Sequence, residues 1–483
     1  MSSTATRTTG VKKRNAPPIV PLVLAVALFM ETMDSTVIAT SLASIASDIH
    51  SDPIALKLAL TSYLLALAIF IPLTGWMADR FGARKIFQIA LGIFIAGSIA
   101  CAASNSLPAF IAARFFQGVG GAMMSPLARI VLVRTTPRSE LVSAMAWLTI
   151  PALIGPIVGP PLGGFLTTYF SWHWIFLINV PIGFLGMWLT QRFLPEFERN
   201  APRRMDFIGF LLVGGSFAGL VFGISVMSLP ALPPGYGIAT LVIGAALGVA
   251  YLMHLRRTPY PVLDLRLFRF PLFRASVIGG AFFRLGVGAT PFLLPLMLQL
   301  DFGLTPFQSG SLVFVGAFGA LAAKFVARPV LTRYGFKRVL AIGAFITGLM
   351  ILAQALFLST TPYPLMMLVL VIGGFAQSTM FTSLNAFGVA DISDKDAGQA
   401  TAITTVIGQL CFALGVSLGG GALEISYALR GGTLAHGDFV AAFVVVGIVG
   451  LMAVWPFARL PGDAGDAISG HRLKSEAAGL EVH

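Results

Sequence analysis

The chain has 483 residues, of which 56% are apolar and only 11% are charged, and its mean hydropathy is +0.86. Soluble globular domains contain about 45–50% apolar and about 25% charged residues, so this composition excludes a soluble multidomain protein. The net charge of +12 still leaves nucleic-acid binding to be tested against the distribution of the charges.

Charge-free apolar stretches repeat along the whole chain. Each has about 20 residues, which is enough to cross a hydrocarbon core of about 30 Å. The pattern predicts an all-α membrane protein with fourteen transmembrane helices. The predicted spans are 19–40, 55–76, 86–104, 108–131, 141–167, 173–191, 206–228, 236–254, 273–299, 307–327, 337–358, 364–387, 398–424 and 438–458.

The basic residues report the topology. Of the 32 lysines and arginines, 26 fall in the two tails, in alternate loops or at the span ends that adjoin these loops. Arg114, Arg129, Arg284 and Lys324 fall inside spans, and only Lys57 and Arg430 fall at the other loops. Loops rich in lysine and arginine face the cytoplasm, so both termini are predicted to be cytoplasmic. The positive charge is thereby explained, and we expect no nucleic-acid partner.

The ends of the chain and its cysteines carry no further chemistry. Residues 1–18 are polar and basic without an apolar core, so we expect a disordered cytoplasmic tail and not a cleaved signal, and 461–483 form a second tail. Cys101 and Cys411 lie in predicted spans as small packing residues. The sequence has no metal-ligand cluster, P-loop or Gly-x-Ser-x-Gly elbow, so we expect no metal, no cofactor and no enzymatic activity.

The first span contains two acidic residues, Glu31 and Asp34, in an otherwise apolar stretch. An ionisable group at bilayer depth costs about 2.5–3.5 kcal/mol on insertion scales. The spacing i, i+3 places both carboxylates on one face of the helix. A chain that keeps two acids there is expected to use them, and this is the first indication of a transporter.

A repeat divides the chain into two halves. The loop after the second span reads Gly75-Trp-Met-Ala-Asp79-Arg80-Phe-Gly82-Ala-Arg84-Lys85, and a weaker copy, Arg333-Tyr-Gly-Phe-Lys-Arg338, follows the tenth span 253 residues later. Internal repeats are the usual build of secondary transporters. Six helices with short loops take about 190 residues, so about 60 residues remain for two additional helices between the halves. We therefore predict an N-terminal six-helix bundle over 19–191, a linker with two extra transmembrane helices over 192–260, and a C-terminal six-helix bundle over 261–460.

Several motifs resemble signatures of the major facilitator superfamily. The loop from Gly75 to Lys85 is similar to the superfamily's loop signature, with Ala83 as a departure. Arg114-Phe-Phe-Gln117-Gly118-Val-Gly120 resembles its Arg-x-x-Gln-Gly-x-Gly motif, and Gly155-Pro156-Ile-Val-Gly159-Pro160-Pro161-Leu-Gly163-Gly164 resembles its antiporter motif.

Two further segments are similar to signatures of the fourteen-span drug:proton antiporters of this superfamily. These are Met33-Asp34-Ser-Thr-Val-Ile and Trp172-His-Trp-Ile-Phe-Leu-Ile-Asn179-Val-Pro181-Ile-Gly183. One departure is that Thr40-Ser-Leu-Ala-Ser stands where the family usually has Asn-Val-Ala-Leu-Pro. The resemblance covers about residues 20–460 and implies a multidrug efflux permease with two six-helix bundles.

The resemblance implies a role for each motif. Gly75, Asp79, Arg80, Gly82, Arg84 and Lys85 would form a gating loop, in which Asp79 pairs with a basic group or helix terminus of the opposite bundle. Because glycines every four residues line one helix face, Gly155, Pro156, Gly159, Pro160, Gly163 and Gly164 would form a bendable seam where the bundles meet. The alternatives are a loop that only fixes topology and ordinary glycine packing.

Charged and polar residues inside the spans are the candidate sites. Asp34, with Glu31, would carry the proton or cation, and Arg114 would act as the switch, with a static ion pair as the alternative. Arg284 matches Glu31 after subtraction of the repeat offset, so the two side chains are expected to pair or to bind opposite ends of a substrate, unless carbonyls and water satisfy Arg284. The substrate-cavity candidates are Gln117, Arg284, Gln299 and Gln409.

Three other charged residues receive lesser roles. Lys324 and Arg328 are predicted to be cytoplasmic anchors, and Glu424 is expected near the periplasmic end, facing water, as a minor candidate for proton transfer.

These patterns favour a proton-coupled exporter of amphipathic small molecules in the inner membrane of a bacterium, with protons and lipid as its other partners. One alternative is a carrier of an organic anion or another metabolite, which Arg284 supports. Another is a membrane sensor that no longer transports, which the intact motifs disfavour. The sequence does not assign a periplasmic adaptor.

Overall fold

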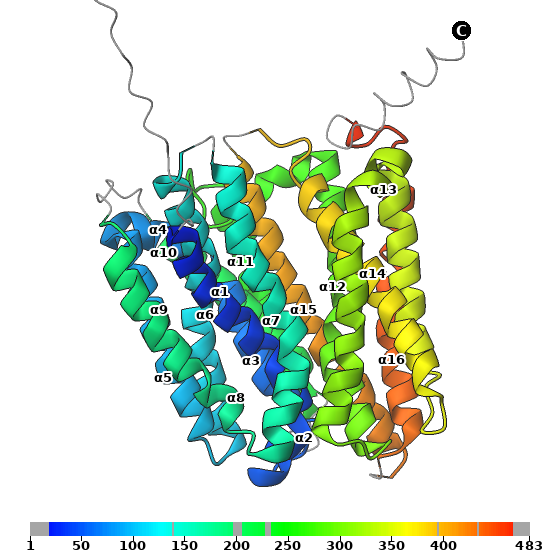
Figure 1. Cartoon of the computed structure of the whole chain (residues 1–483). Coiled ribbons are helices and arrows are strands. Elements are labelled where there is room, and N and C mark those ends of the chain that lie inside the picture. The colour runs from blue at the N-terminus through cyan, green and yellow to red at the C-terminus, as the bar shows by residue number, and fades with distance from the viewer. Residues whose placement is uncertain are drawn as a thin grey trace, which may run out of the picture.

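The computed structural model describes residues 19–137, 140–196, 205–227, 233–393, 396–431 and 434–466. All regular structure in these ranges is helical, and the long helices stand side by side (Figure 1). The predicted tail 1–18 lies outside the described residues, and the predicted tail 461–483 is described only to Asp466. The described chain begins and ends at the same side of the bundle (Figure 1), here called the terminal side, and the other end is called the opposite side.

The N-terminal half forms six spans from nine helices and one 3₁₀ helix within the described residues. Its elements are α1 (Ile19–Val37), η1 (Ile38–Thr40), α2 (Leu42–Asp48), α3 (Lys57–Phe70), α4 (Leu73–Phe81), α5 (Ala83–Ala102), α6 (Leu107–Thr135), α7 (Leu141–Tyr169), α8 (Trp174–Leu177) and α9 (Asn179–Phe193). The spans are α1 with η1, α3 with α4, α5, α6, α7, and α8 with α9. The short α2 is too short to span a membrane, and hydropathy did not predict it.

The C-terminal half forms six further spans, and two helices precede it. The preceding pair is α10 (Phe207–Met227) and α11 (Pro234–Leu255). The half itself contains η2 (Leu265–Arg269), α12 (Pro271–Leu300), α13 (Pro306–Gln354), α14 (Tyr363–Phe387), α15 (Ala397–Leu429), α16 (His436–Leu451) and α17 (Val454–Ala458). These counts again refer only to the described ranges.

Two local breaks explain how fewer helices make fourteen spans. Twelve described helices are long and apolar enough to cross a membrane, and the pair α3 and α4, bent by 57°, supplies a thirteenth span. Pro72 lies at that bend, where a proline removes a backbone donor. The 49-residue α13 contains Gly335 with φ 71°, a left-handed conformation that suits glycine, and this residue separates its two spans. The all-α fold of six, two and six spans is thus the predicted one.

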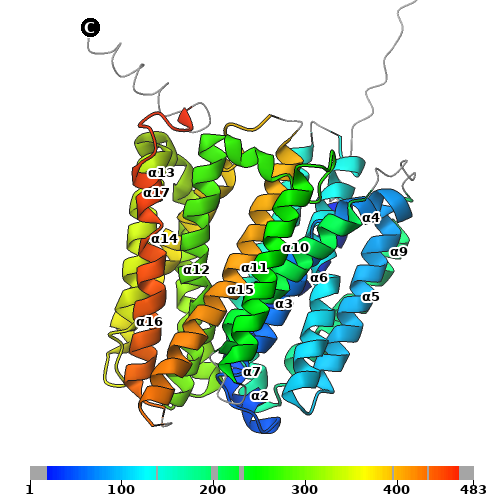
Figure 2. The same cartoon turned by 180° about the vertical axis from the view of Figure 1, so that it is seen from behind.

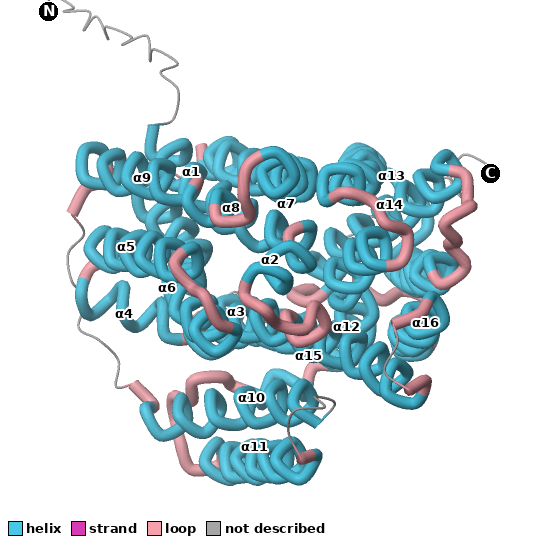
Figure 3. The backbone as a smooth tube through the Cα atoms, turned by 90° about the horizontal axis from the view of Figure 1, so that it is seen from below, coloured by secondary structure: helices cyan, strands magenta, loops and turns pink. Residues whose placement is uncertain are grey.

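The pair α10 and α11 lies outside both bundles (Figure 3). α10 packs along α3 of the N-terminal half and α15 of the C-terminal half (Figure 2). Val221 of α10 is buried in one cluster with Leu65 and Leu410, and Ser225 is hydrogen-bonded to Ser417 at 2.6 Å. The extra helices therefore contact both halves, while α11 exposes large apolar side chains such as Val242 and Ile243 on its outer face.

Candidate functional site

Asp34 lies in the interior of the N-terminal half. Its side chain is fully buried on α1, whereas Ser35 beside it is exposed. α1 packs against α6, α7 and α9, so the face that carries Asp34 is surrounded by protein. A carboxylate in such a place needs charged or hydrogen-bonding partners.

Arg114 of α6 is the charged partner of Asp34. Its Nη1 lies 2.8 Å from Asp34 Oδ2, and its side chain is 1% exposed. The guanidinium also lies over the ring of Tyr63, 4.4 Å from the centroid, which adds a cation–π contact. The structure thus brings together two residues that the sequence assigned to one mechanism without indicating that they touch.

Two amides complete the surroundings of Asp34. Gln117 Nε2 and Asn179 Nδ2 donate to Asp34 Oδ1 at 2.9 and 2.7 Å, and Gln117 also donates to Ser98 at 2.8 Å. Arg114 Nη1 in turn donates to Gln117 Oε1 at 2.5 Å. Gln117 therefore belongs to this buried network, and its prediction as a cavity residue is corrected by the geometry.

Glu31 lies one turn nearer the terminal side than Asp34 and is only half buried. Ser125 Oγ of α6 donates to Glu31 Oε2 at 3.2 Å. No hydrogen bond or ion pair joins Glu31 to Arg284 within the described residues. The structure therefore does not make the predicted direct pair, and the binding of opposite ends of a substrate by these two side chains stays a prediction.

The glycine motif of α7 faces two neighbours. A Cβ at Gly155, Gly159 or Gly163 would collide with Thr32, Thr36 or Val37 of α1, which belongs to the same half. This face of the predicted seam therefore packs α7 onto α1 and does not join the bundles.

The other face of α7 does meet the second half. A Cβ at Gly164 would collide with the backbone of Pro306 in α13, and one at Gly310 of α13 would collide with the backbone of Pro160. Pro156 lines the large cavity described below. The motif thus holds α7 between α1 and α13, and only part of it lies between the halves.

The predicted gating loop is largely helical: Gly75, Asp79 and Arg80 lie in α4, Arg84 and Lys85 lie in α5, and only Gly82 separates the two helices. Gly82 has φ 91°, which explains the glycine at this turn. Asp79 Oδ1 is 2.7 Å from Arg134 Nη2 of α6, so its partner belongs to the same half and not to the opposite bundle. Arg84 Nη2 donates to the Gln191 carbonyl at 2.6 Å, while Arg80 and Lys85 are exposed. A Cβ added at Gly75 would meet no atom of the described residues within 4 Å, so packing does not require a glycine there.

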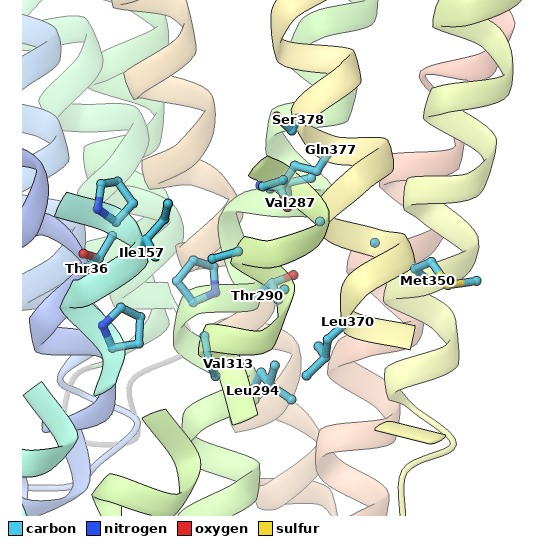
Figure 4. Close-up of a pocket in the computed structure, with 18 of the residues that line it drawn as sticks. Thr36, Ile157, Val287, Thr290, Leu294, Val313, Met350, Leu370, Gln377 and Ser378 are labelled. Carbon is cyan, nitrogen blue, oxygen red and sulfur yellow. The ribbon is translucent and has the colours of Figure 1, made fainter. Parts of the chain in front are cut away.

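A cavity of about 530 Å³ lies between the two halves (Figure 4). The N-terminal half contributes Thr36 and Ile157 to its wall, and the C-terminal half contributes Thr290, Met350 and further residues of α12, α13 and α14. Drug-sized ligands occupy mostly apolar pockets of about 300–1,000 Å³. Size, position and lining therefore suit an amphipathic small molecule.

The predicted cavity glutamines do not line this cavity. Gln299 Nε2 of α12 donates to the Thr40 carbonyl of η1 at 2.9 Å, which joins the halves near the opposite side. Gln409 is half buried on α15 outside the cavity wall. Arg284 is buried one turn before Val287 and contacts the cavity through Phe381, whose ring centroid is 5.8 Å from its Cζ.

A second buried ion pair joins the halves. Lys57 Nζ at the start of α3 donates to Glu424 Oε2 near the end of α15, and both side chains are almost fully buried. Glu424 is therefore not the water-facing group that the sequence predicted, and Lys57, which was assigned to a loop, is buried as well. Hydropathy could not detect the pair because its members lie 367 residues apart in the chain.

The chain belongs to the Major Facilitator Superfamily, whose family model matches residues 24–257 and 276–476. It is therefore a multi-pass membrane protein and a secondary transporter, not an enzyme.

Relatives and solved structures agree with this assignment. The chain is 34% identical over 458 residues to "Putative multidrug resistance protein MdtD" of Cronobacter sakazakii, covering 94% of this chain and 97% of that protein. The protein of the same name from Salmonella heidelberg is 33% identical over 448 residues, or 91% and 94% of the two chains.

Solved structures share the fold at low sequence identity. The D-xylose-proton symporter has a TM-score of 0.67 at 15% identity, covering 92% of this chain and 98% of that one. The human organic anion transporter MFSD10 has a TM-score of 0.60 at 16% identity, covering 92% and 100%. At such identities the likeness establishes the fold alone.

Sequence reasoning missed Ser98, Tyr63 and Asn179 as partners of the Asp34 network. Asn179 was within a quoted signature, so the signal was present although its role was not assigned. The spacing of Gln117 three residues after Arg114 also signals a shared helix face.

Proposed function

We propose that this protein is a proton-coupled antiporter that exports amphipathic small molecules by alternating access of one cavity. The observation that carries the proposal is the combination of a buried Asp34–Arg114 pair in the N-terminal half with a drug-sized cavity whose wall comes from both halves. A cavity between two repeat-related bundles opens to one side or the other when the bundles rock. The multidrug names of the relatives support drug-like substrates.

Asp34 is the proposed proton carrier. Its carboxylate accepts hydrogen bonds from Arg114, Gln117 and Asn179, and we propose that motion of α1 or α6 that separates it from Arg114 accompanies proton transfer. Glu31, half buried and nearer the terminal side, is the proposed relay between Asp34 and water on that side. Arg114 is the switch because its position decides which state of Asp34 is favoured.

Contacts at the opposite side hold the proposed gate closed. Gln299 reaches Thr40, and Phe307 N donates to Thr168 Oγ1 at 3.1 Å, so α12 and α13 are tied to the N-terminal half there. The close approach of Gly164 and Gly310 to the facing backbones seals the same region. The loop from Gly75 to Lys85 would act at the terminal side, where Asp79 can exchange its partner when the halves move.

The terminal side is proposed to be cytoplasmic, in the inner membrane of a bacterium, because the loops that carry most lysines and arginines lie there. The domain limits at 191/192 and 260/261 are part of the same proposal. Reporter fusions after His471 and within 229–235 test it, although His471 and 229–232 lie outside the described residues. They should report opposite sides of the membrane, and the same side for both would refute the topology.

Transport itself is tested with purified protein in vesicles. An imposed pH gradient should drive dye against its concentration gradient, and collapsing that gradient with a protonophore should abolish the accumulation. Moving one charge through 100 mV supplies about 2.3 kcal/mol, and each pH unit about 1.4 kcal/mol. Dye movement that does not respond to the pH gradient or to the membrane potential would refute proton coupling.

The runner-up function is a carrier of an organic anion. The charges around the cavity favour this substrate class, and they are compatible with proton-coupled export.

A further inference from the structure

The charged side chains described at and next to the cavity, Lys324 and Arg284, are both cations. Seven of the described lining residues have polar side chains. Six of these side chains are neutral, and the seventh is the cation Lys324 of α13. None of the described residues that line the wall is an aspartate or a glutamate. A cavity selective for cations would be expected to present a carboxylate, because an unneutralised ligand cation is costly in an apolar site.

A second cation stands behind the wall. Arg284 is 6% exposed and has no hydrogen-bond or ion-pair partner in the part of the chain that the structure describes. Arg114, buried to a similar degree, has Asp34. The C-terminal half therefore buries an arginine without the acid that the N-terminal half supplies, and a buried cation without a partner is costly unless another anion reaches it.

Two glycines lie next to the guanidinium of Arg284. A Cβ added at Gly280 would lie 2.8 Å from its Nη1, and one added at Gly408 would lie 3.1 Å from its Nε. Two glycines from α12 and α15 thus leave room for the group. The ring centroid of Phe381, a residue that lines the cavity, lies 5.8 Å from its Cζ.

The two cations are linked to adjoining residues of α14. Lys324 Nζ donates to Thr382 Oγ1 at 3.0 Å, and Arg284 lies at the ring of Phe381, the residue before Thr382. Farther along the cavity the described lining residues are uncharged and mostly apolar, with Leu294 and Leu370 next to the neutral Thr290 (Figure 4). The cavity therefore has a cationic end and an apolar end.

We propose that the substrates are anionic amphiphiles, in which a carboxylate or sulfonate binds at Lys324 and Arg284 and an aromatic or aliphatic body fills the apolar end. This inference rests on the proposed export function and narrows its substrate class. Arginine suits such a head group because its planar fork donates two parallel hydrogen bonds. Phe381 must shift aside for the head group to reach Arg284, and the membrane potential, negative inside, then favours export of the anion.

The test uses two probes that differ in the head group alone, 1-anilinonaphthalene-8-sulfonate and neutral N-phenyl-1-naphthylamine, with ethidium as a cation. Transport is measured in vesicles under an imposed pH gradient. Wild type should move the sulfonate with a lower KM than the neutral probe. Arg284→Gln and Lys324→Gln should each raise the KM for the sulfonate roughly 10- to 100-fold, the usual value of a hydrogen bond to a charged group, and should leave the neutral probe nearly unchanged.

Two variants keep the result interpretable. Arg328→Gln removes an exposed cation from the same helix outside the cavity wall and should have no effect. Arg284→Lys keeps the positive charge but lacks the planar guanidinium, so it should raise the KM for the sulfonate less than Arg284→Gln does. This difference separates loss of recognition from misfolding.

The outcomes separate this inference from the function on which it rests. If ethidium or the neutral probe is driven by the pH gradient while the sulfonate is not, or if both glutamine variants transport the sulfonate like wild type, the anionic class is wrong and proton-coupled export stands. If no probe of any charge responds to the gradient, the proposed function fails and this inference fails with it.

Discussion

Neutralising either Asp34 or Arg114 alone should lower the free energy of unfolding. Neutralising both should lower it by less than the sum of the two single losses. In Asp34→Asn the new amide would place a donor against Arg114 Nη1 if its oxygen kept the bonds from Gln117 and Asn179. Arg114→Gln leaves the Asp34 carboxylate buried without its cation. Loss of one member of a buried pair costs about 3–5 kcal/mol.

The double variant Asp34→Asn with Arg114→Gln contains no unpaired buried charge. Its loss should fall short of the sum of the single losses by at least about 2 kcal/mol, within the range that coupled neighbours show in double-mutant cycles. The measurement is unfolding of the four purified proteins in one detergent, with expression level recorded. Additive losses would mean that the two groups do not stabilise each other and would refute the network as described.

Two further predictions use matched controls. Gly163→Ala should destabilise the protein by about 1–3 kcal/mol in thermal unfolding, because its Cβ would meet the Val37 carbonyl. The control Gly92→Ala, whose Cβ would meet nothing within 4 Å, should be neutral or slightly stabilising. Equal effects of the two substitutions would refute the packing of α7 on α1. Lys57→Met or Glu424→Gln should increase the separation of labels placed on the two halves at the opposite side. Arg430→Gln, which breaks a pair with Asp438 inside the C-terminal half, should not. Unchanged separation would mean that the buried pair does not hold that side closed.

Hydropathy and charge were sufficient to predict the membrane spans and the order of the two halves. Apolar stretches of the right length leave a helical backbone few alternatives in lipid. The break at Gly335 lies between the predicted spans 307–327 and 337–358, whereas the bend at Pro72 lies inside the predicted span 55–76 and was not predicted. The short α2 was missed because seven residues cannot register as a span.

The candidate site was less predictable because contacts between helices depend on rotation and register. Asp34 and Arg114 were identified as unusual charges, but 80 residues separate them in the chain. Gln117 was assigned to a cavity because its partner was unknown. The repeat offset suggested that Glu31 meets Arg284, yet equivalent positions in two halves need not face each other.

The α7 motif shows the same limit. Glycines every four residues establish a smooth helix face but not the helix that packs on it. Gly155, Gly159 and Gly163 proved to contact α1, and Gly164 contacts α13. The four-residue spacing of the glycines predicts that they share one face of α7. Which helix packs against that face depends on the tertiary structure.

The most direct test of proton coupling at Asp34 compares two activities of one variant. Equal amounts of monodisperse wild type and Asp34→Asn are reconstituted, and both substrate exchange without a gradient and accumulation under an imposed pH gradient are measured. Asp34→Asn should retain exchange and lose gradient-driven accumulation, because the cavity remains and the titrating carboxylate does not. Accumulation by Asp34→Asn at the wild-type level would contradict the assignment of Asp34 as the proton carrier.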